Sequence, residues 1–225
     1  MKIKLDTVIT VTLVVCALVT TGILIHRELF SSSARSARPA EQKPVLIAHW
    51  RDDLGKGTRL GPAEAPVQLL EFADFECPYC AGFHKDVKEL RVRYPTQVTL
   101  TYVHFPLPGH RFALPAARVA ECAGDQGRFE AMYDLLFEQQ DQFGLKAWSE
   151  FATEAGVPDD ATFETCIKRI DPIRRVVEGE QLGKDIDVKG TPTVIVNGWK
   201  LGRPPNAEEL DAMVKAVLAG KSPVS

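Results

Sequence analysis

The apolar positions in the middle of the chain predict a strand, a helix and a second strand in close succession. Residues 67–73 form an apolar run that follows Gly-Pro and Ala-Pro pairs, as expected of a buried strand. From residue 80 to residue 90 the apolar side chains repeat at helical spacing. Residues 98–103 are rich in β-branched side chains and predict a second strand.

The second half of the chain predicts a block of helices and then a hairpin. Between about residues 110 and 188, apolar side chains recur at helical spacing, interrupted by Pro158 and Pro172. Asn197-Gly198 then marks a tight turn between two short strands, because both residues tolerate positive φ. An amphipathic helix is expected over residues 207–218. Together these patterns predict an α/β domain.

A long uncharged segment precedes this domain. Residues 7–25 carry no charge, and a helix of that length spans about 28 Å, close to the roughly 30 Å of a bilayer core. We therefore expect residues 1–30 to form an N-terminal transmembrane helix, with a cleaved signal peptide as the alternative. Residues 31–57 predict a flexible tether and lead-in. The folded domain is then expected over residues 58–225.

Composition narrows the function classes. Apolar residues make up 45% of the chain, which is enough for a core, and a net charge of −3 gives no basic field for nucleic acid. The five cysteines are not spread as in a disulfide-dense secreted scaffold. One lies in the uncharged segment, two are three residues apart, and two are isolated. The chain thus has a core of its own and one focused thiol site.

The thiol site is the motif Cys77-Pro78-Tyr79-Cys80. Cys77 is expected at a helix N-terminus, where unpaired N–H groups and the helix dipole favour a thiolate. Pro78 suits the first helical position, and Cys80 lies one turn further in. This spacing predicts Cys77 as the nucleophile and Cys80 as the resolving thiol. A zinc half-site or a static disulfide are the alternatives, but zinc needs four ligands and no second pair of ligands is spaced nearby.

The thiol motif and the elements predicted around it resemble those of the thioredoxin superfamily. The Cys-Pro-Tyr-Cys motif follows a buried strand, and Gly-Thr-Pro-Thr at residues 190–193 precedes a hairpin. The helical insertion at about 107–188 resembles the DsbA-like branch. Residues 105–107 and 120–123 look like those of membrane-anchored bacterial members. The resemblance covers residues 61–218.

The resemblance implies roles for further residues. The Thr191-Pro192 peptide bond is expected to be cis and to lie against the motif, with the backbone of Thr191 pairing with an extended substrate. An ordinary trans proline at a strand start is the alternative. Pro78 and Tyr79 set the redox character in the family. Glu71 is expected behind the resolving cysteine, where a buried carboxyl relays its proton, unless it lies at the strand surface.

Other polar and thiol side chains leave alternatives open. Cys122 and Cys166 both lie on apolar helix faces, where they are either buried free thiols or, in an oxidising compartment, a structural disulfide of the kind some relatives carry. The negative charge of Glu76 is expected to raise the pKa of Cys77. The histidines His84, His104 and His110 have no partners that the sequence reveals, so structural or surface roles are expected.

The resemblance implies a protein thiol–disulfide oxidoreductase without a cofactor. A disulfide oxidase acting on reduced or misoxidised exported polypeptides is the leading hypothesis, with an isomerase or reductase of the same fold second. A redox-inert chaperone or a metal-delivery module is the hypothesis from another class. An oxidase implies a DsbB- or VKOR-like quinone-linked reoxidant in the membrane. We expect a monomer, anchored by residues 7–25 in the cytoplasmic membrane with its catalytic domain on the periplasmic side.

Overall fold

The computed structural model describes residues 13–22 and 43–224 of the chain. The chain consists of two units, residues 1–41 and a compact unit over residues 42–225. Residues 13–22 are helical, and the rest of the predicted membrane anchor lies outside the described residues. Across the described ranges, no helix has the length and apolar character needed to cross a membrane.

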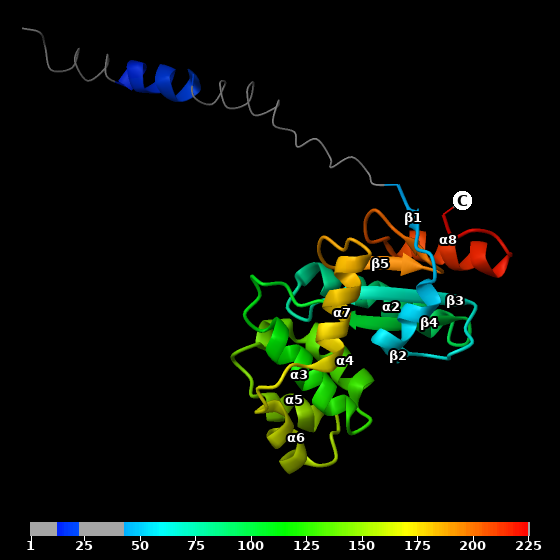
Figure 1. Cartoon of the computed structure of the whole chain (residues 1–225). Coiled ribbons are helices and arrows are strands. Elements are labelled where there is room, and N and C mark those ends of the chain that lie inside the picture. The colour runs from blue at the N-terminus through cyan, green and yellow to red at the C-terminus, as the bar shows by residue number, and fades with distance from the viewer. Residues whose placement is uncertain (1–12, 23–42, 225) are drawn as a thin grey trace, which may run out of the picture. The chain divides into compact units, whose positions relative to one another are not determined.

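A six-stranded mixed sheet in the order β1-β6-β5-β3-β4-β2 forms the centre of the compact unit (Figure 1). Its strands are β1 (Val45–Leu46), β2 (Thr58–Leu60), β3 (Val67–Ala73), β4 (Val98–His104), β5 (Thr193–Val196) and β6 (Trp199–Lys200). The central strand β3 is parallel to β4 and antiparallel to β5. The site at the end of β3 is thus assembled from segments far apart in sequence.

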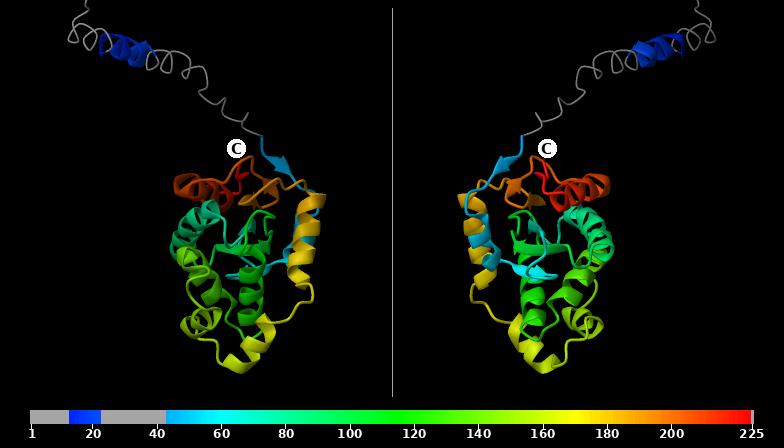
Figure 2. Two further views of the ribbon diagram at one scale, coloured as in Figure 1. Left: turned by 90° about the vertical axis from the view of Figure 1, so that its left-hand side faces the viewer. Right: turned by 90° about the vertical axis from the view of Figure 1, so that its right-hand side faces the viewer.

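Helices cover both faces of this sheet. They are α2 (Pro78–Arg93), α3 (Ala113–Gly124), α4 (Phe129–Glu138), α5 (Trp148–Glu154), α6 (Asp160–Ile167), α7 (Arg174–Asp185) and α8 (Ala207–Leu218), with 3-10 turns η2 (Trp50–Lys56) and η3 (Gln140–Gln142). Figure 2 shows α7 on one side of the strands and α2 with α8 on the other. The helices α3 to α6 gather at one end of the sheet (Figure 1).

Two cores follow from the alternation of side chains along β3. Leu69 and Ala73 belong to the larger core, which includes side chains of α2, α8 and the helical insertion. Leu70 and Phe72 belong to a smaller core with Leu182 of α7. Because successive side chains of a strand point to opposite faces, Glu71 lies on the α2 face with Leu69 and Ala73.

The predicted strands and helices of the domain are confirmed, and the lead-in before it contains elements that the sequence did not predict. Residues 45–56 are not a flexible connection, because β1 pairs with β6 and η2 follows it. Trp50 is buried against Gly198, where a β-carbon would lie only 2.4 Å from the indole ring. The folded unit therefore includes these residues and begins before residue 58.

Candidate active site around Cys77 and Cys80

Cys77 stands at the N-terminus of α2, as the sequence predicted. It is the N-cap residue, and Pro78 occupies the first turn of the helix. The Cys77 N–H donates to the backbone oxygen of Asp74 across 3.0 Å, and the Ala81 N–H donates to the Cys77 oxygen across 3.2 Å. The sulfur thus lies beside free N–H groups of the first helical turn, which favour negative charge.

This environment makes Cys77 acidic for a thiol. The pKa of Cys77 is lowered to about 5, and a hydrogen bond from the Cys80 side chain is the largest cause. Interactions with the Thr191 side chain and with the backbone of Tyr79 and Cys80 lower it further, whereas burial acts to raise it. A thiolate is the nucleophilic form of cysteine. Cys77 is therefore ready to attack near neutral pH. The Glu76 carboxylate accepts a hydrogen bond from the Phe112 N–H, and its expected effect on the Cys77 pKa stays a prediction.

Cys80 has the opposite character. Its side chain is fully buried, and this burial, followed by its hydrogen bond to Cys77 and the charge of Glu71, raises the pKa of Cys80 well above its ordinary value. Only a hydrogen bond from the backbone of Asp74 acts in the other direction. The two thiols of the motif are both buried but differ strongly in acidity.

Glu71 lies fully buried in β3, on the face that α2 covers. Neither of its carboxylate oxygens has a hydrogen-bond partner among the described residues. Burial, and to a smaller extent the charge of Cys77, raises the pKa of Glu71 to about 8. The carboxyl is therefore largely protonated near neutral pH and interacts electrostatically with both cysteines.

The Thr191-Pro192 peptide bond is cis, which confirms that expectation. The Cys77 Sγ lies 3.5 Å from the backbone oxygen of Thr191. The pairing of β5 with β3 brings this loop to the motif, since Thr193 lies opposite Phe72 near the end of β3. Beside the buried sulfurs, Tyr79 is 78% exposed. The surface next to Cys77 thus combines an exposed ring with the cis-proline loop.

Sequence reasoning missed how the turn before Cys77 is held. The carboxylate of Asp74 is completely buried and accepts hydrogen bonds from Leu107 and His110. The Gln140 amide of η3 donates to the backbone oxygens of Phe75 and Cys77 at 2.5 and 3.0 Å. The position of Asp74, three residues before Cys77, was the only available signal, because the other partners come from distant segments.

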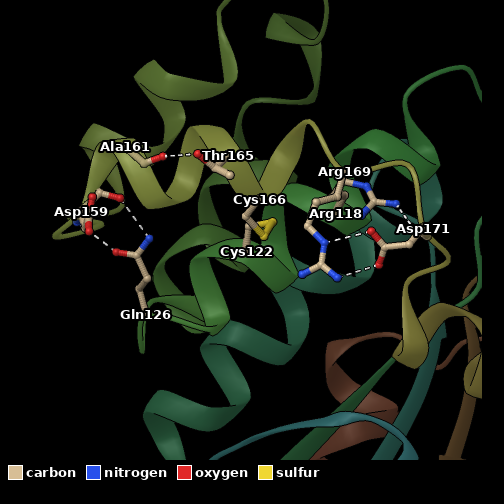
Figure 3. The surroundings of a disulfide bond; sticks show 9 residues. All are labelled: Arg118, Cys122, Gln126, Asp159, Ala161, Thr165, Cys166, Arg169 and Asp171. Atoms are coloured by element: carbon tan, nitrogen blue, oxygen red, sulfur yellow. Dashed lines mark hydrogen bonds and ion pairs between the residues drawn. A yellow bond between two sulfur atoms is a disulfide. The ribbon is translucent and has the colours of Figure 1, made fainter.

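The helical insertion contains a disulfide between Cys122 of α3 and Cys166 of α6 (Figure 3). It closes a sequence separation of 44 residues and ties the two helices together. Beside it, the Asp171 carboxylate accepts two hydrogen bonds from Arg169, both at 2.9 Å (Figure 3). The two sulfurs of the Cys77–Cys80 site, in contrast, are free thiols in the structure.

The structure gives each of the three histidines a carboxylate partner that the sequence did not reveal. His84 lies 2.7 Å from Asp134, His104 lies 3.0 Å from Glu121, and His110 lies 2.7 Å from Asp74. Tertiary packing supplies these carboxylates from segments 17 to 50 residues away, a distance at which sequence spacing carries no signal.

The group of His84, Asp134 and Glu138 has the residue types of a metal site. The Lys88 ammonium lies 3.0 Å from Asp134 and 2.6 Å from Glu138. The Lys88 ammonium thus occupies the position next to these carboxylates that a metal ion would take.

Comparison with known proteins places the fold and the site in a family. Residues 53–216 match the family described as thioredoxin. A thioredoxin-like oxidoreductase from Silicibacter pomeroyi is 25% identical, with a TM-score of 0.60 over 72% of this chain and 93% of that chain. The alpha-DsbA1 of Wolbachia pipientis, 18% identical, has the same fold, with a TM-score of 0.62 over 73% of this chain and 92% of that chain.

A curated relative shows the same region in a longer protein. The Na(+)/H(+) antiporter NhaA 3 of Salinispora tropica is 38% identical over 160 residues, which are 71% of this chain and 24% of that protein. The chain thus spans about a quarter of the length of this relative. With a family match over residues 53–216, which include both the CxxC motif and the cis-proline loop, the chain belongs to the thioredoxin family.

Proposed function

We propose that this chain is a disulfide oxidase that donates the Cys77–Cys80 disulfide to exported polypeptides while they fold. The observation that carries this proposal is the lowered pKa of Cys77, about 5. Reduction of the disulfide creates this thiolate, so every interaction that stabilises the thiolate favours the reduced form. A disulfide whose reduced form is stabilised is a strong oxidant.

The reaction consists of two exchanges. A substrate thiolate attacks the Cys77 sulfur, the Cys77–Cys80 bond breaks, and Cys80 leaves with the electron pair and takes up a proton. A second substrate thiolate then attacks the substrate sulfur of the mixed disulfide, and Cys77 leaves as a thiolate. Two electrons pass from the substrate dithiol to the protein, and the substrate gains one disulfide.

Glu71 is proposed to exchange the proton that Cys80 takes up. Its carboxyl is buried on the α2 face of the sheet and its pKa of about 8 keeps it protonated when the disulfide is attacked. The same group accepts a proton from Cys80 when a reoxidant regenerates the disulfide. Because its charge raises the pKa of Cys80, the neutral form of Glu71 eases the departure of that sulfur.

The substrate is proposed to bind as an extended peptide beside the cis-proline loop. The backbone oxygen of Thr191 lies 3.5 Å from the Cys77 sulfur, and the exposed ring of Tyr79, two residues after Cys77, offers apolar surface. Backbone pairing with Thr191 is independent of substrate sequence, because every peptide carries the same N–H and C=O groups. This suits a catalyst that acts on many unfolded chains.

An oxidase must have its Cys77–Cys80 disulfide regenerated, and it must meet exported polypeptides. A DsbB- or VKOR-like quinone-linked membrane protein is the proposed reoxidant, and residues 7–25 are proposed to anchor the chain in the cytoplasmic membrane with its domain on the periplasmic side. The absence of charge over those residues supports this part. An anchor raises the effective concentration of the domain near such a partner.

The direction of the reaction is tested by the equilibrium of the Cys77–Cys80 pair with glutathione. A reduction potential near that of DsbA, about −120 mV, supports the oxidase, and a value near that of thioredoxin, about −270 mV, overturns it. The Cys77→Ser variant serves as the control, since it removes the exchange itself. An isomerase is the alternative, and repair of a scrambled substrate at a rate that exceeds oxidation of a reduced one would favour it.

A further inference from the structure

Two residues outside the motif converge on the turn that carries both cysteines. Asp74 links β3 to α2, and His110 lies in the connection between β4 and α3. They are 36 residues apart, and their side chains meet at 2.7 Å between His110 Nδ1 and Asp74 Oδ2.

The backbone of Asp74 contacts both cysteines. Its carbonyl oxygen accepts the Cys77 N–H across 3.0 Å, which fixes the first residue of the motif. Its backbone also acts to lower the pKa of the Cys80 thiol, against the effect of burial. A displacement of Asp74 therefore alters the surroundings of the attacked sulfur and of the leaving sulfur together.

The side chain of Asp74 holds this backbone in place. The carboxylate has no solvent exposure and accepts three hydrogen bonds, from the Glu76 N–H at 2.8 Å, the Leu107 N–H at 2.8 Å and His110. A buried charge is strongly disfavoured unless such donors compensate it. Of the three, only His110 donates from a side chain, so it is the member that substitution removes without disturbing the backbone.

We propose that Asp74 and His110 are a positioning pair that sets the redox equilibrium of Cys77 and Cys80 through the backbone of Asp74. This inference rests on the proposed thiol–disulfide exchange, but not on its direction. In that exchange Cys80 leaves as the Cys77–Cys80 bond breaks, and the Asp74 backbone stabilises the departing sulfur.

Loss of the His110 donor is therefore expected to destabilise the dithiol form relative to the disulfide. In the His110→Ala variant, the equilibrium constant with glutathione is expected to shift toward the disulfide by about threefold to tenfold, with slower reduction by glutathione. The His110→Asn variant retains a side-chain N–H donor and is expected to stay within about twofold of the unmodified protein. The Asp74→Asn variant, which replaces an acceptor by a donor, is expected to shift in the same direction as His110→Ala.

The matched control is His84, a second histidine that pairs with an aspartate at 2.7 Å. Its partner Asp134 lies in α4, and among the described residues the pair's further polar contact is with Lys88, not with the turn before Cys77. The His84→Ala variant is therefore expected to lower the unfolding midpoint and leave the glutathione equilibrium unchanged. The unfolding midpoints of the oxidised and reduced forms are measured for every variant, because a purely structural role lowers both equally.

The outcomes separate this pair from the proposed function. An unchanged glutathione equilibrium in both His110→Ala and Asp74→Asn overturns the positioning role, even where the midpoints fall. A shift in both variants but not in His84→Ala supports it. A thioredoxin-like potential of the unmodified chain would overturn the oxidase and leave the relative shift as a valid test of the pair.

Discussion

The Sγ atom of Cys77 lies 3.5 Å from the backbone oxygen of Thr191, although 114 residues separate the two in sequence. This contact joins the start of α2 to the cis-proline loop, and it is the side on which a peptide substrate is proposed to approach. Because the side chain of Thr191 also lowers the pKa of Cys77, the loop affects both binding and reactivity.

The Cys77 thiol should titrate near pH 5. Alkylation of the reduced protein by iodoacetamide is expected to follow the thiolate fraction, with a midpoint at about pH 5, far below the ordinary value of about 8.5. Since the pKa is lowered in the folded state, the thiolate adds stability to the reduced form at alkaline pH, and this stability is lost as the pH falls toward 5. A midpoint near 8.5 would contradict the proposed stabilisation.

The Thr191→Val variant should be less acidic at Cys77. Valine has nearly the shape of threonine but no hydroxyl, so the side-chain interaction that lowers the Cys77 pKa is lost. The alkylation midpoint is expected to rise by about one pH unit, equivalent to about tenfold slower alkylation at a pH well below it. Thr191→Ser, which retains the hydroxyl, is the matched control. Equal midpoints in the two variants would assign the effect to the backbone alone.

The Glu71→Gln variant should be more stable and less active. In the unmodified protein the pKa of Glu71 is about 8 when folded and 4.5 when unfolded. The protonated carboxyl therefore makes its full contribution to the free energy of unfolding below pH 4.5, and this contribution is lost as the pH rises to 8. Glutamine does not ionise, so the variant is expected to gain on the order of 3 kcal/mol at pH 7 and nothing at pH 4. Urea unfolding at both pH values measures this difference.

Activity supplies the second readout for Glu71. If the carboxyl exchanges the Cys80 proton, the rate of disulfide transfer to a reduced peptide falls in Glu71→Gln, while alkylation of Cys77 continues. A variant that is both more stable and fully active would leave Glu71 as a buried acid without a proton-transfer role.

Removal of the Cys122–Cys166 disulfide should destabilise the domain without altering the thiol chemistry. The bridge closes a separation of 44 residues between α3 and α6, so its loss in the double alanine variant is expected to lower the free energy of unfolding by about 2–4 kcal/mol. The glutathione equilibrium of Cys77 and Cys80 is expected to stay unchanged. A shift of that equilibrium would show that the insertion and the active site are coupled through the disulfide.

The sequence by itself determined the order of the main elements and the place of the reactive cysteine. Helical periodicity after residue 80, with Pro78 in the first turn, was enough to put Cys77 at a helix start, because these signals are local. The sequence pattern did not predict the two short strands and the 3-10 helix that lie within residues 45–60. The strands β1 and β2 are two and three residues long, too short for a periodic pattern, and form only because the edges of the sheet accept them.

Only the tertiary structure decided which residues meet at the site. The strand order places β5 beside β3 and so brings Thr191 to Cys77, and the alternation along β3 turns Glu71 toward the face that α2 covers. The pairing of Asp74 with His110 likewise depends on where the connection after β4 folds back. Such contacts depend on chain topology and burial, and burial is also what sets the acidity of the Glu71 carboxyl and the Cys80 thiol.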